Sequence, residues 1–171
     1  GVLGWGCEDE SFEVREAVLM NPADSSTTVK VRDSKDAEWR ELITFPYGEE
    51  GGMIDFSADC KSVLCTSSLG RDTTALLRLD AATGETLETI ASRDKCDCGG
   101  ILLDDDTKAV RAVSFNYARV EREFFDAELE ADFKALAAAG PEGAEVAIAS
   151  RTRDESVWVV SYRRDDGPTE Y

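Results

Sequence analysis

The sequence predicts an all-β protein made of short antiparallel strands. Residues 27–32 alternate β-branched and polar side chains, and this two-residue period is typical of a strand with one buried face. Elsewhere, short apolar runs alternate with turn-forming segments that are rich in Asp, Gly and Ser. The chain has 171 residues and is 42% apolar, which is enough material for the core of one domain.

Eleven segments have the pattern of strands, and they lie at 12–20, 27–32, 39–45, 53–57, 62–67, 73–79, 86–90, 99–103, 109–115, 145–150 and 156–162. The four strands between 53 and 90 follow one another through tight turns, which predicts one antiparallel meander. In the turn at 80–84, Gly84 stands where a hairpin needs a positive φ.

The strand pattern restarts at a regular spacing along the chain. The starts at Ile54, Ile101 and Val146 are 47 and 45 residues apart, which is the period of four-stranded propeller blades. We therefore expect a partial β-propeller of about three to four four-stranded antiparallel blades. The expected single incomplete domain covers 1–171, and its blade-like units are 12–47, 53–91, 99–140 and an incomplete 145–171.

One helix is predicted near 126–139, inserted in the third unit. Its apolar residues are spaced as on one helix face: Phe125, Leu129, Phe133 and Leu136. Asp126 is suited to cap the start of the helix, and Gly140 followed by Pro141 is suited to end it. We expect the helix to pack against a blade; binding of a partner is the alternative.

Composition excludes several functions for this chain. With 36 acidic and 19 basic residues the net charge is −17, which argues against binding to nucleic acid or to anionic lipid. No apolar run approaches the ~20 residues of a membrane span, and no signal peptide is visible. We therefore expect a soluble, intracellular protein without membrane insertion. The absence of His excludes a His-based triad and the common His-containing zinc sites.

The five cysteines are Cys7, Cys60, Cys65, Cys96 and Cys98. An odd number does not fit a secreted disulfide framework, so reduced thiols are favoured. One disulfide is an alternative. A four-thiolate metal site from Cys60, Cys65, Cys96 and Cys98 is another, although these spacings are not the usual C-x₂-C pairs.

Asp104 to Asp106 are consecutive acids followed by Lys108, which favours a solvated turn over a calcium loop with alternating ligands. Arg71 and Asp72 are expected to pair or to fix a turn, with a ligand role as the alternative.

Further charged and aromatic residues have simple structural interpretations. Residues 8–10 and 49–50 are expected to form solvated acidic loops. Four residues of alternating charge are expected on an exposed strand or loop face: Arg119, Glu121, Arg122 and Glu123. For the tryptophans, core packing is the default and ligand stacking the alternative: Trp5, Trp39 and Trp158.

Residues 56–62, Phe-Ser-Ala-Asp-Cys-Lys-Ser, resemble the F-S-x-D-G-K-S turn of the propeller repeats in prolyl oligopeptidase-type serine peptidases. Further stretches resemble that family in its own order: 66–76, 99–102, 112–117 and 159–168. The resemblance covers about 12–171 and is of the acylaminoacyl peptidase and dipeptidyl peptidase kind. Where the family has Gly this chain has Cys60, whose β-carbon costs on the order of 1 kcal/mol at a positive φ.

The resemblance implies an enzyme with an N-terminal propeller and a C-terminal α/β-hydrolase domain that holds the Ser, Asp and His of the triad. This chain has no His and no G-x-S-x-G, so we assign it no catalytic, cofactor-binding or metal-ligating residue and expect no cofactor. Residues 165–168 resemble a turn that leads into another strand, so we expect the chain to be a piece of a longer protein.

The resemblance therefore implies the non-catalytic propeller part of a serine peptidase, which covers the active site and restricts peptide access. Its expected partners are the hydrolase domain of the same parent chain and peptide substrates. The alternative is a stand-alone propeller-derived interaction module, or an accessory subunit that binds other proteins.

Overall fold

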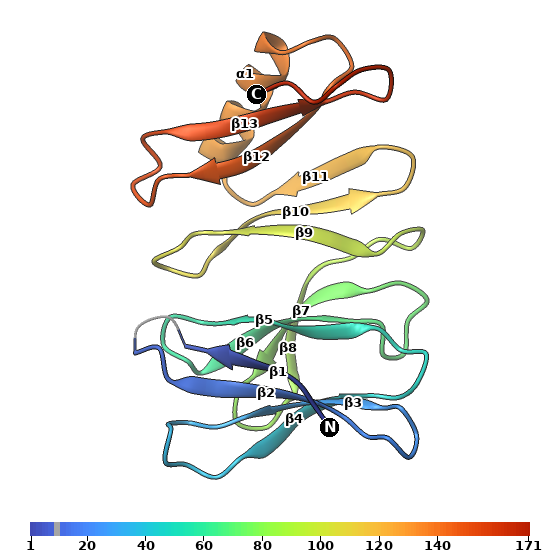
Figure 1. Ribbon diagram of the computed structural model, residues 1–171, viewed down its shortest axis with the longest axis vertical. Coiled ribbons are helices and arrows are strands. Elements are labelled where there is room, and N and C mark those ends of the chain that lie inside the picture. The colour runs from blue at the N-terminus through green and yellow to red at the C-terminus, as the bar shows by residue number, and fades with distance from the viewer. Residues whose placement is uncertain (9–10) are drawn as a thin grey trace.

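The computed structural model describes residues 1–8 and 11–171, and it is all-β with one helix, as predicted (Figure 1). Two of its sheets have four antiparallel strands in chain order. The first sheet comprises β1 (Val2–Cys7), β2 (Val14–Met20), β3 (Thr27–Val31) and β4 (Arg40–Phe45). The second comprises β5 (Gly51–Phe56), β6 (Ser62–Ser67), β7 (Ala75–Asp80) and β8 (Thr86–Ala91).

The other two sheets are smaller. The third has β9 (Cys98–Leu103), β10 (Val110–Asn116) and β11 (Val120–Phe124). The fourth pairs β12 (Glu145–Arg151) with β13 (Trp158–Arg163), and α1 (Ala127–Ala139) connects these two sheets. The expectation of four strands in each complete unit fails for the third sheet, which has three strands, and the predicted helix follows the third of them directly.

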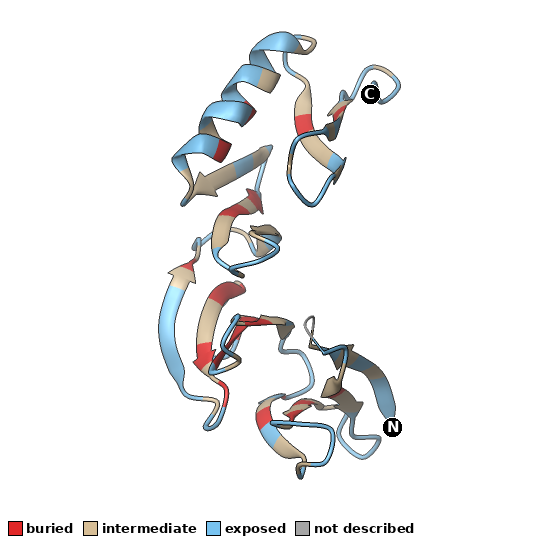
Figure 2. Cartoon of the chain, turned by 90° about the vertical axis from the view of Figure 1, so that its left-hand side faces the viewer, coloured by how far each residue is buried: buried red, intermediate tan, exposed pale blue. Residues whose placement is uncertain are grey.

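The four sheets are stacked face to face along the long axis of the molecule (Figure 1). Each pair of neighbouring sheets encloses its own apolar core: Val29 and Val63 lie in the first core, Leu76 and Val113 in the second. The third core joins the third sheet to α1 and the fourth sheet. The stack is curved, and α1 lies on its convex side (Figure 2). Face-to-face packing of twisted sheets along an arc is the arrangement of neighbouring propeller blades.

Strand β1 was not predicted, so the first sheet begins at Val2 rather than at residue 12. Its two glycines, Gly4 and Gly6, weaken the strand signal, because glycine has a low β-propensity. Pairing with β2 overrides that propensity, with Trp5 opposite Ala17 in the register. The side chain of Trp5 stacks in a tilted arrangement on Trp39, with ring centroids 5.9 Å apart.

The first hairpin of every sheet contains a non-glycine residue with a positive φ. These residues are Phe12 (55°), Cys60 (54°), Lys108 (59°) and Glu155 (55°), which recur every 47 or 48 residues. The strain expected at Cys60 is therefore present, and three of the four side chains explain why it is tolerated. Cys60 packs on the first core, while Lys108 and Glu155 form ion pairs with the preceding sheet.

Helix α1 begins and ends as predicted. The Asp126 carboxylate accepts hydrogen bonds from the backbone N–H groups of Glu128 and Leu129, and Gly140 is the C-cap. Leu129 and Phe133 are buried in the third core, so the helix packs against the sheets. Phe125 was expected on this face but precedes the helix and is 47% exposed. No helix among the described residues is long and apolar enough to cross a membrane.

Candidate functional site

Charged side chains form a first cluster near the β9–β10 turn. Lys108, in the β9–β10 turn, places its Nζ 3.0 Å from Oδ2 of Asp55 on β5, and both side chains are largely shielded from water. Glu16 on β2 lies near the same region. Burial, followed by the charge of Asp55, raises the pKa of Glu16 above its ordinary value. The Lys108–Asp55 ion pair connects the second and third sheets, whereas the carboxylates of Glu16 and Asp55 repel each other.

Arg111 on β10 is the centre of a second ionic cluster, between the third and fourth sheets. Its Nε lies 2.6 Å from Asp126, and its Nη1 lies 2.6 Å from Glu155 of the β12–β13 turn. Arg151 on β12 also contacts Glu155, at 2.8 Å, and reaches back to Asp105 at 3.0 Å. The cluster joins both sheets to the start of α1, which is a structural role.

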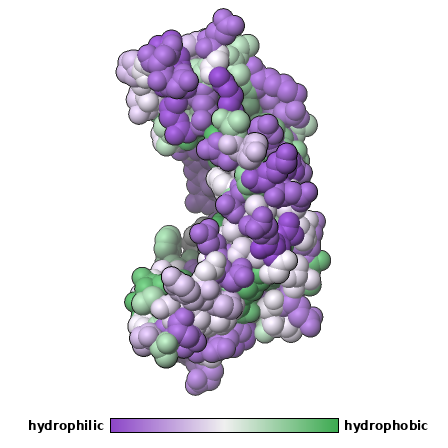
Figure 3. Space-filling model, turned by 90° about the vertical axis from the view of Figure 1, so that its right-hand side faces the viewer, coloured by the Kyte–Doolittle hydropathy of each residue, from purple (hydrophilic) through white to green (hydrophobic). Residues whose placement is uncertain are grey.

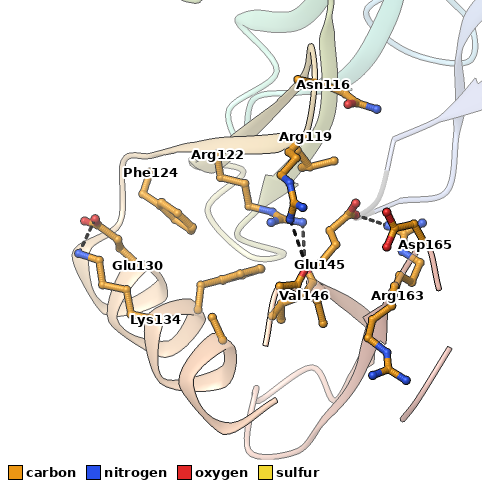
Figure 4. A pocket seen from close by; sticks show the side chains of 17 residues that line it. Asn116, Arg119, Arg122, Phe124, Glu130, Lys134, Glu145, Val146, Arg163 and Asp165 are labelled. Atoms are coloured by element: carbon orange, nitrogen blue, oxygen red, sulfur yellow. Dashed lines mark hydrogen bonds and ion pairs between the residues drawn. The ribbon is translucent and has the colours of Figure 1, made fainter. Parts of the chain in front are cut away.

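A cavity of about 690 Å³ lies between β11, α1 and the fourth sheet. Arg122 projects into it from β11, with its guanidinium 4.8 Å from the ring centre of Phe133. Its Nη2 donates a 2.8 Å hydrogen bond to the carbonyl of Val146 (Figure 4). The expectation that Arg122 lies on an exposed face is therefore wrong for this residue, because α1 folds over it and leaves it half-buried.

The remaining charges around the cavity are mostly paired. Lys134 on α1 contacts Glu130 at 2.7 Å, and Arg163 on β13 contacts Glu145 at 2.6 Å (Figure 4). Arg119, in contrast, donates to the carbonyl of Gly143 at 3.2 Å. A cavity of this size lies within the usual range of small-molecule sites, roughly 300–1,000 Å³.

The acidic run at 104–106 forms a turn with exposed Asp105 and Asp106, as expected, and its carboxylates also make specific contacts. Asp104 caps its own turn by accepting from the backbone N–H of Thr107 at 2.7 Å, which lowers the pKa of Asp104. Asp105 and Asp106 form ion pairs with arginines of the fourth sheet, at 3.0 and 2.7 Å. These carboxylates are therefore engaged in turn formation and sheet contacts.

All five cysteines are free thiols, in agreement with the favoured interpretation. Burial raises the pKa of Cys65 to about 12 and that of Cys98 to about 11. High pKa values oppose thiolate chemistry. Within residues 1–8 and 11–171, no group of three Cys, Asp or Glu residues is arranged to hold a metal ion.

Several smaller expectations have mixed outcomes. Arg71 donates to the carbonyl of Thr73 at 3.4 Å, and across the described chain no ion pair joins it to Asp72. Trp158 packs in the third core, whereas Trp5 is 60% exposed on the first sheet. The Glu49 carboxylate accepts from Ser68 at 2.6 Å, so it is not simply solvated. Asp9 and Glu10 lie outside the described residues.

Comparison with known proteins gives one informative match. The chain is 33% identical over 169 residues, or 95% of its length, to dipeptidyl aminopeptidase BIII of Pseudoxanthomonas mexicana. These residues span 23% of that protein, so the chain is homologous to about a quarter of a larger peptidase. No family model and no solved structure matches the chain.

Proposed function

We propose that this chain is the non-catalytic propeller part of a prolyl oligopeptidase-like serine peptidase. In this role it covers the active site and restricts which peptides reach it. The observation that carries the proposal is the match of nearly the whole chain to part of a dipeptidyl aminopeptidase. The F-S-x-D-x-K-S turn at 56–62 and its place in a β-hairpin support the same assignment.

In this proposal the four sheets are consecutive blades of one incomplete propeller domain. Their shared topology, in which each sheet begins with an antiparallel hairpin, agrees with a blade repeat. The space-filling view shows a molecule hollowed on one side (Figure 3). Further blades of the parent chain would continue the arc around this hollow. The enclosed space would admit extended peptides and exclude folded proteins.

The chemistry itself belongs outside these residues. A serine peptidase needs an imidazole base, and this chain has no His. The parent protein therefore supplies the nucleophile, the base and the oxyanion donors in an α/β-hydrolase domain, which is the main proposed partner. Peptide substrates are the second partner.

The first experiment is the intact mass of the natural protein, with peptide mapping beyond Tyr171. The proposal expects a mass several times 18.7 kDa and a G-x-S-x-G segment in the additional sequence. It also expects release of dipeptides from short substrates, blocked by a serine-directed inhibitor. A natural chain near 18.7 kDa would contradict the proposal and favour a stand-alone interaction module.

The access role needs a separate test in the natural full-length protein. Arg111→Gln removes the Arg111–Glu155 ion pair, one of the pairs that join the third and fourth sheets, while Arg78→Gln removes one pair within the second sheet and is the control. We expect Arg111→Gln to raise cleavage of long peptides relative to dipeptidyl substrates. Equal rates in both variants and the parent would refute restriction of access by this segment.

A further inference from the structure

The cavity beneath α1 has a local charge opposite to that of the whole chain. The protein carries a net charge of −17, yet arginines and a lysine lie around this cavity. The acidic groups at the same place are Glu130, Glu145 and Asp165. Whether the cavity attracts an anion therefore depends on which of these charges are already compensated.

Ion pairing neutralises most of the cationic groups. Glu130 pairs with Lys134 and Glu145 pairs with Arg163, at 2.7 and 2.6 Å. Arg164 is directed to carboxylates outside the cavity, including that of Glu170 at 3.3 Å. Two guanidinium groups, those of Arg119 and Arg122, have no carboxylate partner among the described residues, against one unpaired carboxylate.

Arg119 and Arg122 are held by neutral groups instead. Arg119 donates a hydrogen bond to the carbonyl of Gly143, and Arg122 donates one to the carbonyl of Val146. The ring of Phe133 lies against the guanidinium group of Arg122. Such contacts orient a guanidinium but leave its charge in place. Burial lowers the pKa of Arg122, and the nearby charge of Glu145 offsets this lowering only in part. A bound anion would complete the compensation.

We propose that this cavity binds a small organic carboxylate with an apolar substituent, and that Arg122 is its main ligand. The carboxylate forms charge-assisted hydrogen bonds with the remaining N–H donors of Arg122, and Arg119 contributes at the rim. Its substituent packs against the apolar side chains of Val120 and Phe124, which also line the cavity.

The charge balance favours a monoanion over a phosphate dianion. Two guanidinium groups without an ion-pair partner among the described residues face one unpaired carboxylate, that of Asp165, so the side chains lining the cavity have an excess of one positive charge. A dianion would leave negative charge uncompensated in a partly desolvated site, which is costly. The apolar walls add affinity only for a ligand with carbon atoms to bury.

Binding is tested in the natural full-length protein with N-acetyl-phenylalanine at pH 7, by isothermal titration calorimetry. N-acetyl-phenylalaninamide has the same apolar group without the charge, and inorganic phosphate has charge without the apolar group. We expect the acid to bind at least about tenfold more tightly than either, since charge-assisted hydrogen bonds contribute about 1.5–3 kcal/mol each. Equal binding of acid and amide, preferred binding of phosphate, or no binding of the acid would overturn the proposal.

Variants then locate the site. Arg122→Gln should weaken binding of the acid at least about tenfold, and Arg122→Lys should weaken it less because charge remains but the planar fork is lost. Arg119→Gln should cause a smaller loss, and Arg78→Gln, whose side chain pairs with Glu88 on the second sheet, should cause none. Unchanged affinity in Arg122→Gln would refute the assignment. If that variant fails to fold, Arg119→Gln still decides. A peptidase active site elsewhere in the parent protein could also bind the acid, and affinity that is unchanged in the arginine variants would assign the binding to that site and overturn the proposal for the cavity.

Discussion

Replacing Gly84 with alanine tests how closely the β7–β8 turn approaches the first sheet. Gly84 has a φ of +74°, and an added β-carbon would lie far inside contact distance of the Leu42 carbonyl oxygen on β4. The left-handed backbone alone costs alanine about 1 kcal/mol. Pushing two backbone segments apart in a packed interface adds roughly 1–3 kcal/mol. We therefore expect Gly84→Ala to lower the local stability by about 2–4 kcal/mol.

Two other glycines separate these contributions. Gly48 also has a positive φ, of +92°, but a β-carbon there meets open space, so Gly48→Ala should cost only about 1 kcal/mol. Gly52 has no positive φ, and an added β-carbon there meets open space, so Gly52→Ala should leave the stability nearly unchanged. Hydrogen exchange, read by mass spectrometry in peptides that cover β4, β7 and β8, measures the opening free energy. Equal losses in Gly84→Ala and Gly48→Ala would refute the close approach of the turn to β4.

Three further predictions concern charges and thiols. Arg111→Met should lower the unfolding free energy by about 2 kcal/mol, because it removes the partly shielded ion pairs of Arg111 with Asp126 and Glu155 and leaves Glu155 paired with Arg151 alone; urea unfolding measures the loss, and an unchanged unfolding free energy would contradict it. Glu16→Gln should raise stability at pH 7 but not near pH 4. Because the folded-state pKa of Glu16 is raised, the wild-type protein has the full stability contribution of this group below the ordinary pKa of 4.5, where the carboxyl is protonated, and loses it as pH rises through the folded-state pKa. Identical thermal unfolding of both forms at pH 7 would contradict this. At pH 8 a thiol reagent should label the exposed Cys7 in the folded protein but should label Cys65 only after unfolding, because burial raises the pKa of Cys65 to about 12. Mass spectrometry of the labelled peptides measures the modification of each cysteine.

The strands were predictable because local signals and packing agree. The alternation at 27–32 and the turn ending in Gly84 both specify structure within a few residues, and both are found. Strand β1 was missed because its pairing with β2 outweighs a glycine-rich sequence, and such pairing is not encoded locally. The backbone strain at Cys60 was predicted from the sequence. The ion pairs that Lys108 and Glu155, at the equivalent turn positions, form with the preceding sheet were not predicted, because they depend on how the sheets stack.

The cavity could not be predicted from the sequence for a related reason. Arg119 and Arg122 lie in a segment of alternating charge, which locally indicates an exposed strand. Only the return of the chain through α1 and β12 covers Arg122 and brings the Val146 carbonyl to it. Arg122 and Val146 are 24 residues apart, and no local sequence pattern predicts a contact at that separation. The helix, in contrast, is evident from the spacing of Leu129 and Phe133.

The division of the interior into three separate cores has a mechanical consequence. Each core joins one sheet only to its neighbours, so a force applied between the two ends of the chain loads the interfaces in series. A series arrangement is no stronger than its weakest connection, and linear stacks of repeats unfold unit by unit for this reason. The fourth sheet has only two strands. Extension should therefore detach that sheet first, while the two four-stranded sheets remain joined through the core that contains Val29 and Val63.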